Sequence, residues 1–137
     1  MVAGIMDREE KAYRMPPLTL AYIGDAVWEL SVRNHLVASG ETQPRRLHRL
    51  AVSRVRAKAQ ADRLYQISKH LSDRERDVVR RGRNAKSPSI PKSATVADYR
   101  ASTGIEALLG YLYIAGAQER LEEVLQLLLH IEENDEC

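Results

Sequence analysis

The sequence of 137 residues contains a single cysteine, Cys137, and it is the last residue. A lone cysteine excludes an intramolecular disulfide and any metal site built from paired cysteines. No run of 18 apolar residues occurs, so no membrane-spanning helix is expected. The N-terminal stretch MVAGIMDREEKAYRM has neither the apolar core of a secretory signal nor the acid-poor composition of a transit peptide. We therefore expect a cytoplasmic protein that does not bind membranes.

Aromatic residues are also scarce, with one Trp, six Tyr and no Phe. The core must therefore be built mainly from aliphatic side chains, a composition that favours helices over a sandwich or barrel. The length and a hydrophobic content of 44% suit one compact domain. We predict that Trp28 and the tyrosines belong to this core rather than to a base-stacking surface.

Helical patterns cover most of the chain, and no segment alternates convincingly as a strand. Prolines at 16 and 17 suit a first helical turn, and glycines at 40 and 116 suit helix ends. Ser72 followed by Glu75 forms the S-x-x-E pattern of a capping box. We predict an all-α helical bundle with helices at 17–39, 47–67, from 73 toward 82, 95–115 and 119–134, and a positively charged loop, RGRNAKSPSIPKSA, at 81–94.

Charge is unevenly distributed although the net charge is only +2. Residues 44–92 contain fifteen Lys or Arg against four acids, whereas residues 119–136 contain seven acids and one Arg. A basic segment of this density is typical of a protein that binds a polyanion, nucleic acid first. The alternative is a set of solvated helix faces with no partner.

Two acids lie within the most apolar helical stretches, Asp25 in AYIGDAVW and Glu106 in GIEALLGYL. Burying a carboxylate there costs several kcal/mol unless a partner compensates it. Each acid could instead point along a helix edge to solvent or accept structural hydrogen bonds. Glycines at 24, 104 and 110 favour a close approach of a backbone or ligand, because glycine within a helix costs roughly 1 kcal/mol relative to alanine.

A pair of carboxylates facing each other across two helices would be stabilised by a divalent cation. Oxygen ligands without a His or Cys cluster favour Mg²⁺, with Mn²⁺ as the second choice. Such a cation can activate water and stabilise the leaving oxygen of a phosphodiester. Together with the basic segment, the acids at 25 and 106 support the hypothesis of a nuclease.

These residues also form familiar motifs. LAYIGDAVWELSVRNHL resembles the signature helix of the ribonuclease III catalytic domain, and ASTGIEALLGYLYIAG resembles its second acidic helix. With RLHRLAVSRVRAKAQA, RRGRNAKS and the short length, the chain is similar to the Mini-III ribonucleases, which lack a separate double-stranded-RNA-binding domain. The resemblance implies a homodimeric ribonuclease III fold, with a tail or short helix at 1–15, a catalytic domain at 16–134 and a tail at 135–137.

The resemblance also assigns roles to particular residues. It implies that Asp25 and Glu106 are the catalytic metal ligands. Larger relatives carry further acids where this chain has Ala21 and Thr103, a loss shared with the Mini-III subgroup. Fewer charged ligands usually bind a metal more weakly. We expect waters held by Ser102 or Thr103, together with an RNA phosphate, to complete the coordination.

The activity implied is cleavage of double-stranded RNA by water, leaving a 5′-phosphate and a 3′-hydroxyl, with precursor 23S ribosomal RNA as the target and a ribosomal protein as an assisting partner. A lone catalytic domain must contact RNA phosphates from its own fold. We expect these contacts from Arg81, Arg83, Asn84, Lys86, Lys92 and Arg100. A non-catalytic RNA-binding module and a helical protein that binds an acidic partner are the alternatives.

Overall fold

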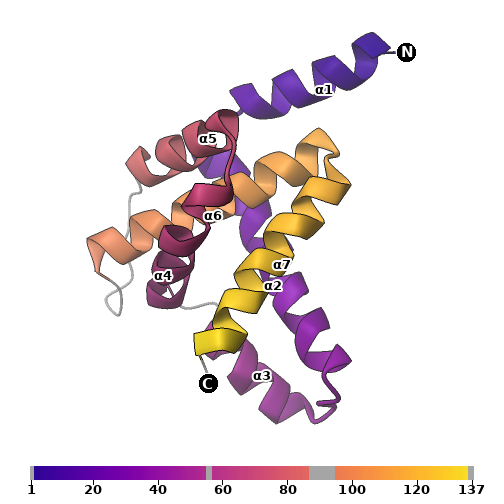
Figure 1. Cartoon of the computed structure of the whole chain (residues 1–137), viewed down its shortest axis with the longest axis vertical. Helices are drawn as coiled ribbons and strands as arrows, with labels where there is room; N and C mark the ends of the chain where they lie inside the picture. Colours follow the sequence, from indigo (N-terminus) through magenta and orange to yellow (C-terminus); the bar gives the residue numbers. More distant parts are fainter. Residues whose placement is uncertain (1, 55–56, 87–94, 136–137) are drawn as a thin grey trace.

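The computed structural model describes residues 2–54, 57–86 and 95–135, and these form helices joined by short connections (Figure 1). No strand occurs in these ranges, which confirms the all-α prediction. No helix in them is long and apolar enough to cross a membrane. The elements are α1 (Val2–Arg14), α2 (Pro17–Ala38), α3 (Pro44–Arg54), α4 (Ala57–Ile67), the 3₁₀ turn η1 (Ser68–His70), α5 (Asp73–Asn84), α6 (Val96–Ala115) and α7 (Gln118–Asp135).

The helix ends follow the local signals in the sequence. Pro17 occupies the first turn of α2. Ser72 caps α5, where its side chain accepts a hydrogen bond from the Glu75 amide while the Glu75 carboxylate accepts one from the Ser72 amide. Gly116 ends α6 in the left-handed conformation, with a φ of 76°. Each of these boundaries was predictable because it depends on neighbouring residues only.

Helix α6 forms the centre of the bundle and packs against α1, α2, α4, α5 and α7 (Figure 1). From Ala101 to Leu112 every residue is buried except Glu106, which is partly exposed. A helix covered on nearly all sides must be apolar all round, and this explains its sequence. A charged residue in such a segment is therefore placed for a specific purpose or compensated by a specific partner.

Two glycines let α2 and α6 approach closely. A β carbon on Gly24 would overlap the backbone carbonyl of Glu106, and one on Gly110 would overlap the carbonyl of Leu20. The two helices therefore cross at this point, with position 20 against 110 and position 24 against 106. The close approach predicted from glycines 24 and 110 is confirmed, and it brings Asp25, the neighbour of Gly24, to the level of Glu106.

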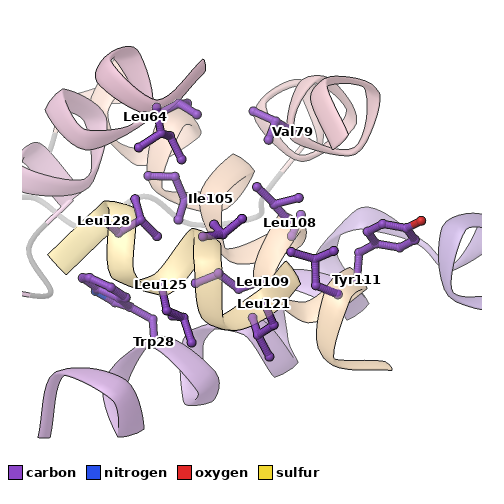
Figure 2. Close-up of a cluster of buried hydrophobic side chains, with 14 of the residues drawn as sticks. Trp28, Leu64, Val79, Ile105, Leu108, Leu109, Tyr111, Leu121, Leu125 and Leu128 are labelled. Carbon is purple, nitrogen blue, oxygen red and sulfur yellow. The ribbon is translucent and has the colours of Figure 1, made fainter. Parts of the chain in front are cut away.

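The core is built from aliphatic side chains around the fully buried Trp28, as predicted (Figure 2). In Figure 2, Ile105 and Leu108 of α6 lie on the side of Leu64 and Val79, whereas Leu109 lies beside Leu121 and Leu125 of α7. The prediction for the tyrosines is wrong in part. The side chains of Tyr22, Tyr65 and Tyr113 are 80%, 84% and 58% exposed, and only Tyr111 is buried.

Two element boundaries also differ from the prediction. The helix expected over 47–67 begins earlier, at Pro44, and is described in two parts, α3 and α4, because residues 55–56 lie outside the described ranges. Helix α5 continues past Gly82 to Asn84 because Gly82 packs against α6, where a β carbon would meet the Gly104 Cα at 2.9 Å. Residues 81–84, at the start of the predicted loop, are therefore helical. The N-terminal segment is a full helix, α1.

Candidate active site

The two predicted acids are brought together where α2 crosses α6. Asp25 follows Gly24 on α2, and the Glu106 carbonyl of α6 lies against Gly24. The charge of Asp25 contributes to the raised pKa of Glu106, a sign that the two carboxylates are within electrostatic reach of each other. The site therefore rests on two tightly packed helices rather than on loops.

Glu106 is the more buried of the pair. The pKa of its carboxyl is raised to about 7, first by burial and then by the negative charges of Asp25 and Glu29, while a hydrogen bond from Ser102 opposes the shift. The Ser102 hydroxyl donates to Glu106 Oε1 at 2.7 Å, one helical turn away. No cation among the residues that the structure describes contributes to this shift, so within them the anionic form of Glu106 lacks the partner that a buried carboxylate requires.

Asp25 differs from the prediction because the residue is exposed rather than buried. Residue 25 faces the outer edge of α2, while Gly24 and Trp28 face the core. Partial desolvation of the carboxyl and the nearby charge of Glu29 still raise its pKa. Asp25 is thus open to a ligand from solvent, and Glu106 forms the deeper side of the site.

Glu29 is the site residue that sequence reasoning missed. It raises the pKa of both Asp25 and Glu106 through its negative charge. The signal that could have found it is its spacing, because residues four apart lie on one face of a helix. Three acids therefore concentrate negative potential at the crossing of α2 and α6.

The donor set fits a hard divalent cation. No cage of three or more His, Cys, Asp or Glu side chains is formed by the residues that the structure describes. Mg²⁺ does not require such a cage, since it keeps several waters and is usually bound through one or two carboxylates and substrate phosphates. Oxygen ligands and a buried carboxylate therefore match Mg²⁺ or Mn²⁺ better than zinc, which favours Cys and His ligands.

The two residues predicted to hold waters near the cation have different roles. Ser102 contacts Glu106 directly, as stated above. Thr103 donates its hydroxyl to the Tyr99 carbonyl at 3.0 Å and is buried in α6. Thr103 lies three residues before Glu106 on the same face of α6, and its hydroxyl can still accept a hydrogen bond, so its role in holding a water near the cation stays a prediction.

Arg81, predicted to contact RNA, is engaged within the protein. Its Nη2 donates to the Tyr13 carbonyl at 2.6 Å, and its guanidinium stacks on the Tyr13 ring. Its Nε forms an ion pair with Asp77 at 3.3 Å, without the alignment of a hydrogen bond. These contacts join α1 to α5, so we correct the assignment of Arg81 from RNA binding to stability.

The other residues predicted to contact RNA are, where the structure describes them, exposed to solvent. Arg83, Asn84 and Lys86 are exposed at the end of α5, and Arg83 forms no ion pair with any residue in the described ranges. Arg100 is exposed on α6, about 9 Å before Glu106 along the helix axis. Lys92 lies outside the described residues.

Comparison with known proteins identifies this arrangement of helices and acids. The model of the ribonuclease III domain matches residues 18–117, which include α2 to α6 and both acids. The chain belongs to the ribonuclease III domain family. Its N-terminal helix α1 lies outside the matched segment.

Two relatives with known names indicate which members of the family this chain is most like in sequence. The chain is 56% identical over 112 residues to Mini-ribonuclease 3 of Symbiobacterium thermophilum, which covers 82% of this chain and 86% of the relative. It is 47% identical over 123 residues to Mini-ribonuclease 3 of a Thermoanaerobacter species, covering 90% and 87%. These matches confirm the predicted resemblance and the enzyme class, an endoribonuclease of the ribonuclease III type.

A solved structure supports the fold. A crystal structure of a protein from Fusobacterium nucleatum superimposes with a TM-score of 0.76 at 28% sequence identity, covering 87% of this chain and 95% of that protein. The match extends over nearly all of both chains. The helical architecture is thus that of a known protein of similar length.

Proposed function

We propose that this ribonuclease III-type enzyme cuts double-stranded RNA at the crossing of α2 and α6, using a divalent cation held by Asp25 and Glu106. The observation that carries this proposal is the uncompensated carboxylate of Glu106, whose raised pKa reflects burial next to Asp25 without a cationic partner. An acid kept under such a penalty in a buried helix is better explained by function than by stability.

The bound cation and the residues of the chain would have different roles in the reaction. When bound, Mg²⁺ or Mn²⁺ would lower the pKa of a coordinated water and neutralise charge on the scissile phosphate. Asp25 would bind from the exposed side of the site and Glu106 from the buried side, while Ser102 fixes the Glu106 carboxylate through Oε1. The close packing at Gly24 keeps the spacing of the two acids constant. Attack by water leaves a 5′-phosphate and a 3′-hydroxyl.

The RNA is held by exposed basic residues. Arg83 and Asn84 end α5, Lys86 follows it and Arg100 lies near the start of α6, so these residues lie at the same end of the bundle. The groove geometry of A-form RNA favours recognition of shape and backbone, which needs phosphate contacts rather than base contacts. We include Lys92 in this set on the basis of its charge alone.

We further propose a homodimer built on the exposed face of α2. Leu18 and Tyr22 present apolar side chains to solvent on this face, and Tyr22 is 80% exposed. Leu18, Tyr22 and Asp25 lie within about 60° of one another around the helix, so a dimer formed here would place two active sites close together. Such a pair would suit the two strands of a duplex.

The natural substrate and location complete the proposal. We propose precursor 23S ribosomal RNA in the cytoplasm as the target, with a ribosomal protein assisting on the natural RNA. The relatives named Mini-ribonuclease 3 support an RNA-processing role of this kind.

The deciding experiment compares a long RNA duplex with a single strand of the same sequence, each incubated with the protein and Mg²⁺, with Mn²⁺, or with EDTA. Cleavage of the duplex alone, dependent on metal, with 5′-phosphate ends, is the expected result. Binding of the duplex without cleavage under every metal condition would refute catalysis and favour a non-catalytic RNA-binding module. No duplex affinity at all would leave the protein-binding alternative.

A further inference from the structure

A surface pocket lies between α4, α5 and the start of α6, on a different side of α6 from Glu106. It encloses about 420 Å³, and we call it the Tyr65 pocket. Its floor is apolar and consists of side chains that also belong to the core, Leu64, Leu71, Val79 and Ala101. The pocket is therefore rigid, because its floor cannot move without disturbing the packing of three helices.

The rim of the Tyr65 pocket combines an aromatic ring with cations. Tyr65 lines it and is 84% exposed, although burial of its ring would be favourable. Arg76, Arg80 and Arg83 line the side formed by α5, and Asp98 lies on the side of α6. An exposed aromatic ring beside three guanidinium groups is not required by the fold, since the floor alone closes the core.

The arginines on this rim differ in how firmly they are held. Arg76 donates to the Ser68 carbonyl at 3.1 Å and pairs with the fully exposed Asp73 at 3.7 Å. Arg80 pairs with Asp77 at 2.6 Å, and its side chain is mostly exposed. Surface pairs of this kind contribute little to stability, so a phosphate can replace the carboxylate partner.

Arg83 provides the most available cation of the rim. A β carbon on Gly104 would meet the Arg83 Cγ at 2.8 Å, so the aliphatic part of Arg83 lies on the surface of α6. Within the described ranges no carboxylate pairs with its guanidinium. The side chain is therefore positioned by its stem and free to bind a phosphate with its head.

An apolar floor, one exposed aromatic ring and several guanidinium groups match the chemistry of a nucleotide, whose base stacks and whose phosphate pairs with arginine. A base within a duplex is already stacked and cannot enter such a pocket. The ligand must therefore be a base that lies outside the helix. Along the axis of α6, Asp98 precedes Glu106 by about 12 Å, a distance of a few nucleotides of strand.

We propose that the Tyr65 pocket binds an unpaired nucleotide of the RNA substrate, such as a bulged base close to the duplex that is cut. This inference rests on the proposed function, because it assumes an RNA substrate. Binding of a nucleotide in this pocket adds a preference among RNA substrates that phosphate contacts alone do not provide. The enzyme would then select duplexes with a local irregularity at a fixed distance from the cleaved bond.

The test measures affinity in EDTA, where no cleavage occurs, for two RNA duplexes of equal length, one fully paired and one with a single bulged nucleotide. The unaltered protein is expected to bind the bulged duplex at least about fivefold more tightly, the effect of one stacked base. Tyr65→Ala should reduce this ratio to about one, and Tyr65→Phe should retain it because the ring remains. Gln66→Ala, an exposed neighbour outside the pocket, is the matched control and should also retain the ratio.

The possible results test nucleotide binding in the Tyr65 pocket separately from the proposed function. Equal affinity of the unaltered protein for the two duplexes, or a ratio unchanged in Tyr65→Ala, would overturn it. Binding of free AMP in this pocket without a preference for bulged RNA would also overturn it. Normal cleavage of a paired duplex in those cases would leave the proposed function intact, whereas absence of any duplex binding would refute the function itself. Circular dichroism of Tyr65→Ala confirms that an exposed substitution leaves the fold unchanged.

Discussion

The Cα of Gly24 lies against the backbone carbonyl of Glu106, so closely that no side chain fits between α2 and α6 at this point. This contact sets the separation of the two helices that supply the catalytic acids. The contact between the two helix backbones therefore sets the position of the active site.

Gly24→Ala should destabilise the protein by roughly 3 kcal/mol, because the added methyl must separate two packed helices. The gain in helix propensity, up to about 1 kcal/mol, is too small to offset this cost. Denaturant unfolding measures the difference. Thr19→Ala, an exposed change on the same helix, should lie within about 0.5 kcal/mol of the unaltered protein. Equal stability of the two variants would contradict the close contact.

Stability in acid should depend on Glu75. Burial alone would raise the pKa of this carboxyl, but hydrogen bonds from Arg120 and Ser72 outweigh burial and lower it. Arg120 donates to both carboxylate oxygens at 2.8 Å and joins α7 to the start of α5. Because the folded pKa is below the unfolded value, this contribution is complete above the unfolded pKa near 4.5 and is lost as the pH falls through the folded pKa.

Thermal unfolding followed from pH 7 to pH 2 tests this dependence. Glu75→Gln should lower the melting temperature at pH 7 and flatten its decline in acid, since the variant has no carboxyl to protonate at this position. Glu122→Gln, an exposed acid on α7, should leave the profile unchanged. An identical decline in the Glu75 variant would show that the ion pair with Arg120 does not control acid stability.

Tyr22→Glu should convert the proposed dimer into a monomer. The ring is 80% exposed in the single chain, and a charge placed in a buried apolar interface costs several kcal/mol. Sedimentation analysis gives the mass of each species. Tyr113→Glu, an exposed tyrosine on α6, serves as the comparison. A dimer that persists in the Tyr22 variant would move the interface away from α2.

Two arginines of α5 should behave in opposite ways. Arg81→Ala should reduce stability by about 1–3 kcal/mol through the loss of its contacts with Tyr13 and Asp77, and leave the salt dependence of duplex binding unchanged. Arg83→Ala should retain stability and reduce the slope of log affinity against log salt by about one, the loss of one phosphate contact. The reverse pattern would contradict the corrected assignment.

The features predictable from the sequence are those that depend on nearby residues. The capping box at Ser72 and the left-handed end at Gly116 are specified by a few neighbouring positions. The helix class and the identity of the acids at 25 and 106 follow from periodicity and from the resemblance to a family. The glycines at 24 and 110 signalled a close helix approach because their cost within a helix requires an explanation.

The features that escaped prediction depend on partners distant in sequence. Arg81 is occupied because α1 packs beside α5, with Tyr13 68 positions away. Glu75 pairs with Arg120 across 45 positions. Asp25 is exposed because the packing of α2 on α6 turns it to the outer edge of the helix, and periodicity in an almost wholly apolar helix does not specify which face is buried.

The central claim is that Asp25 and Glu106 form the metal site almost alone, and the rate of cleavage of one long RNA duplex in Mg²⁺ tests it most directly. Asp25→Asn and Glu106→Gln should each reduce the rate by more than roughly 100-fold while the protein remains folded, because each removes one of two charged ligands. Glu106→Gln should not lower stability, since it removes a buried charge that lacks a cationic partner. Cleavage by either variant within about tenfold of the unaltered protein would contradict the claim.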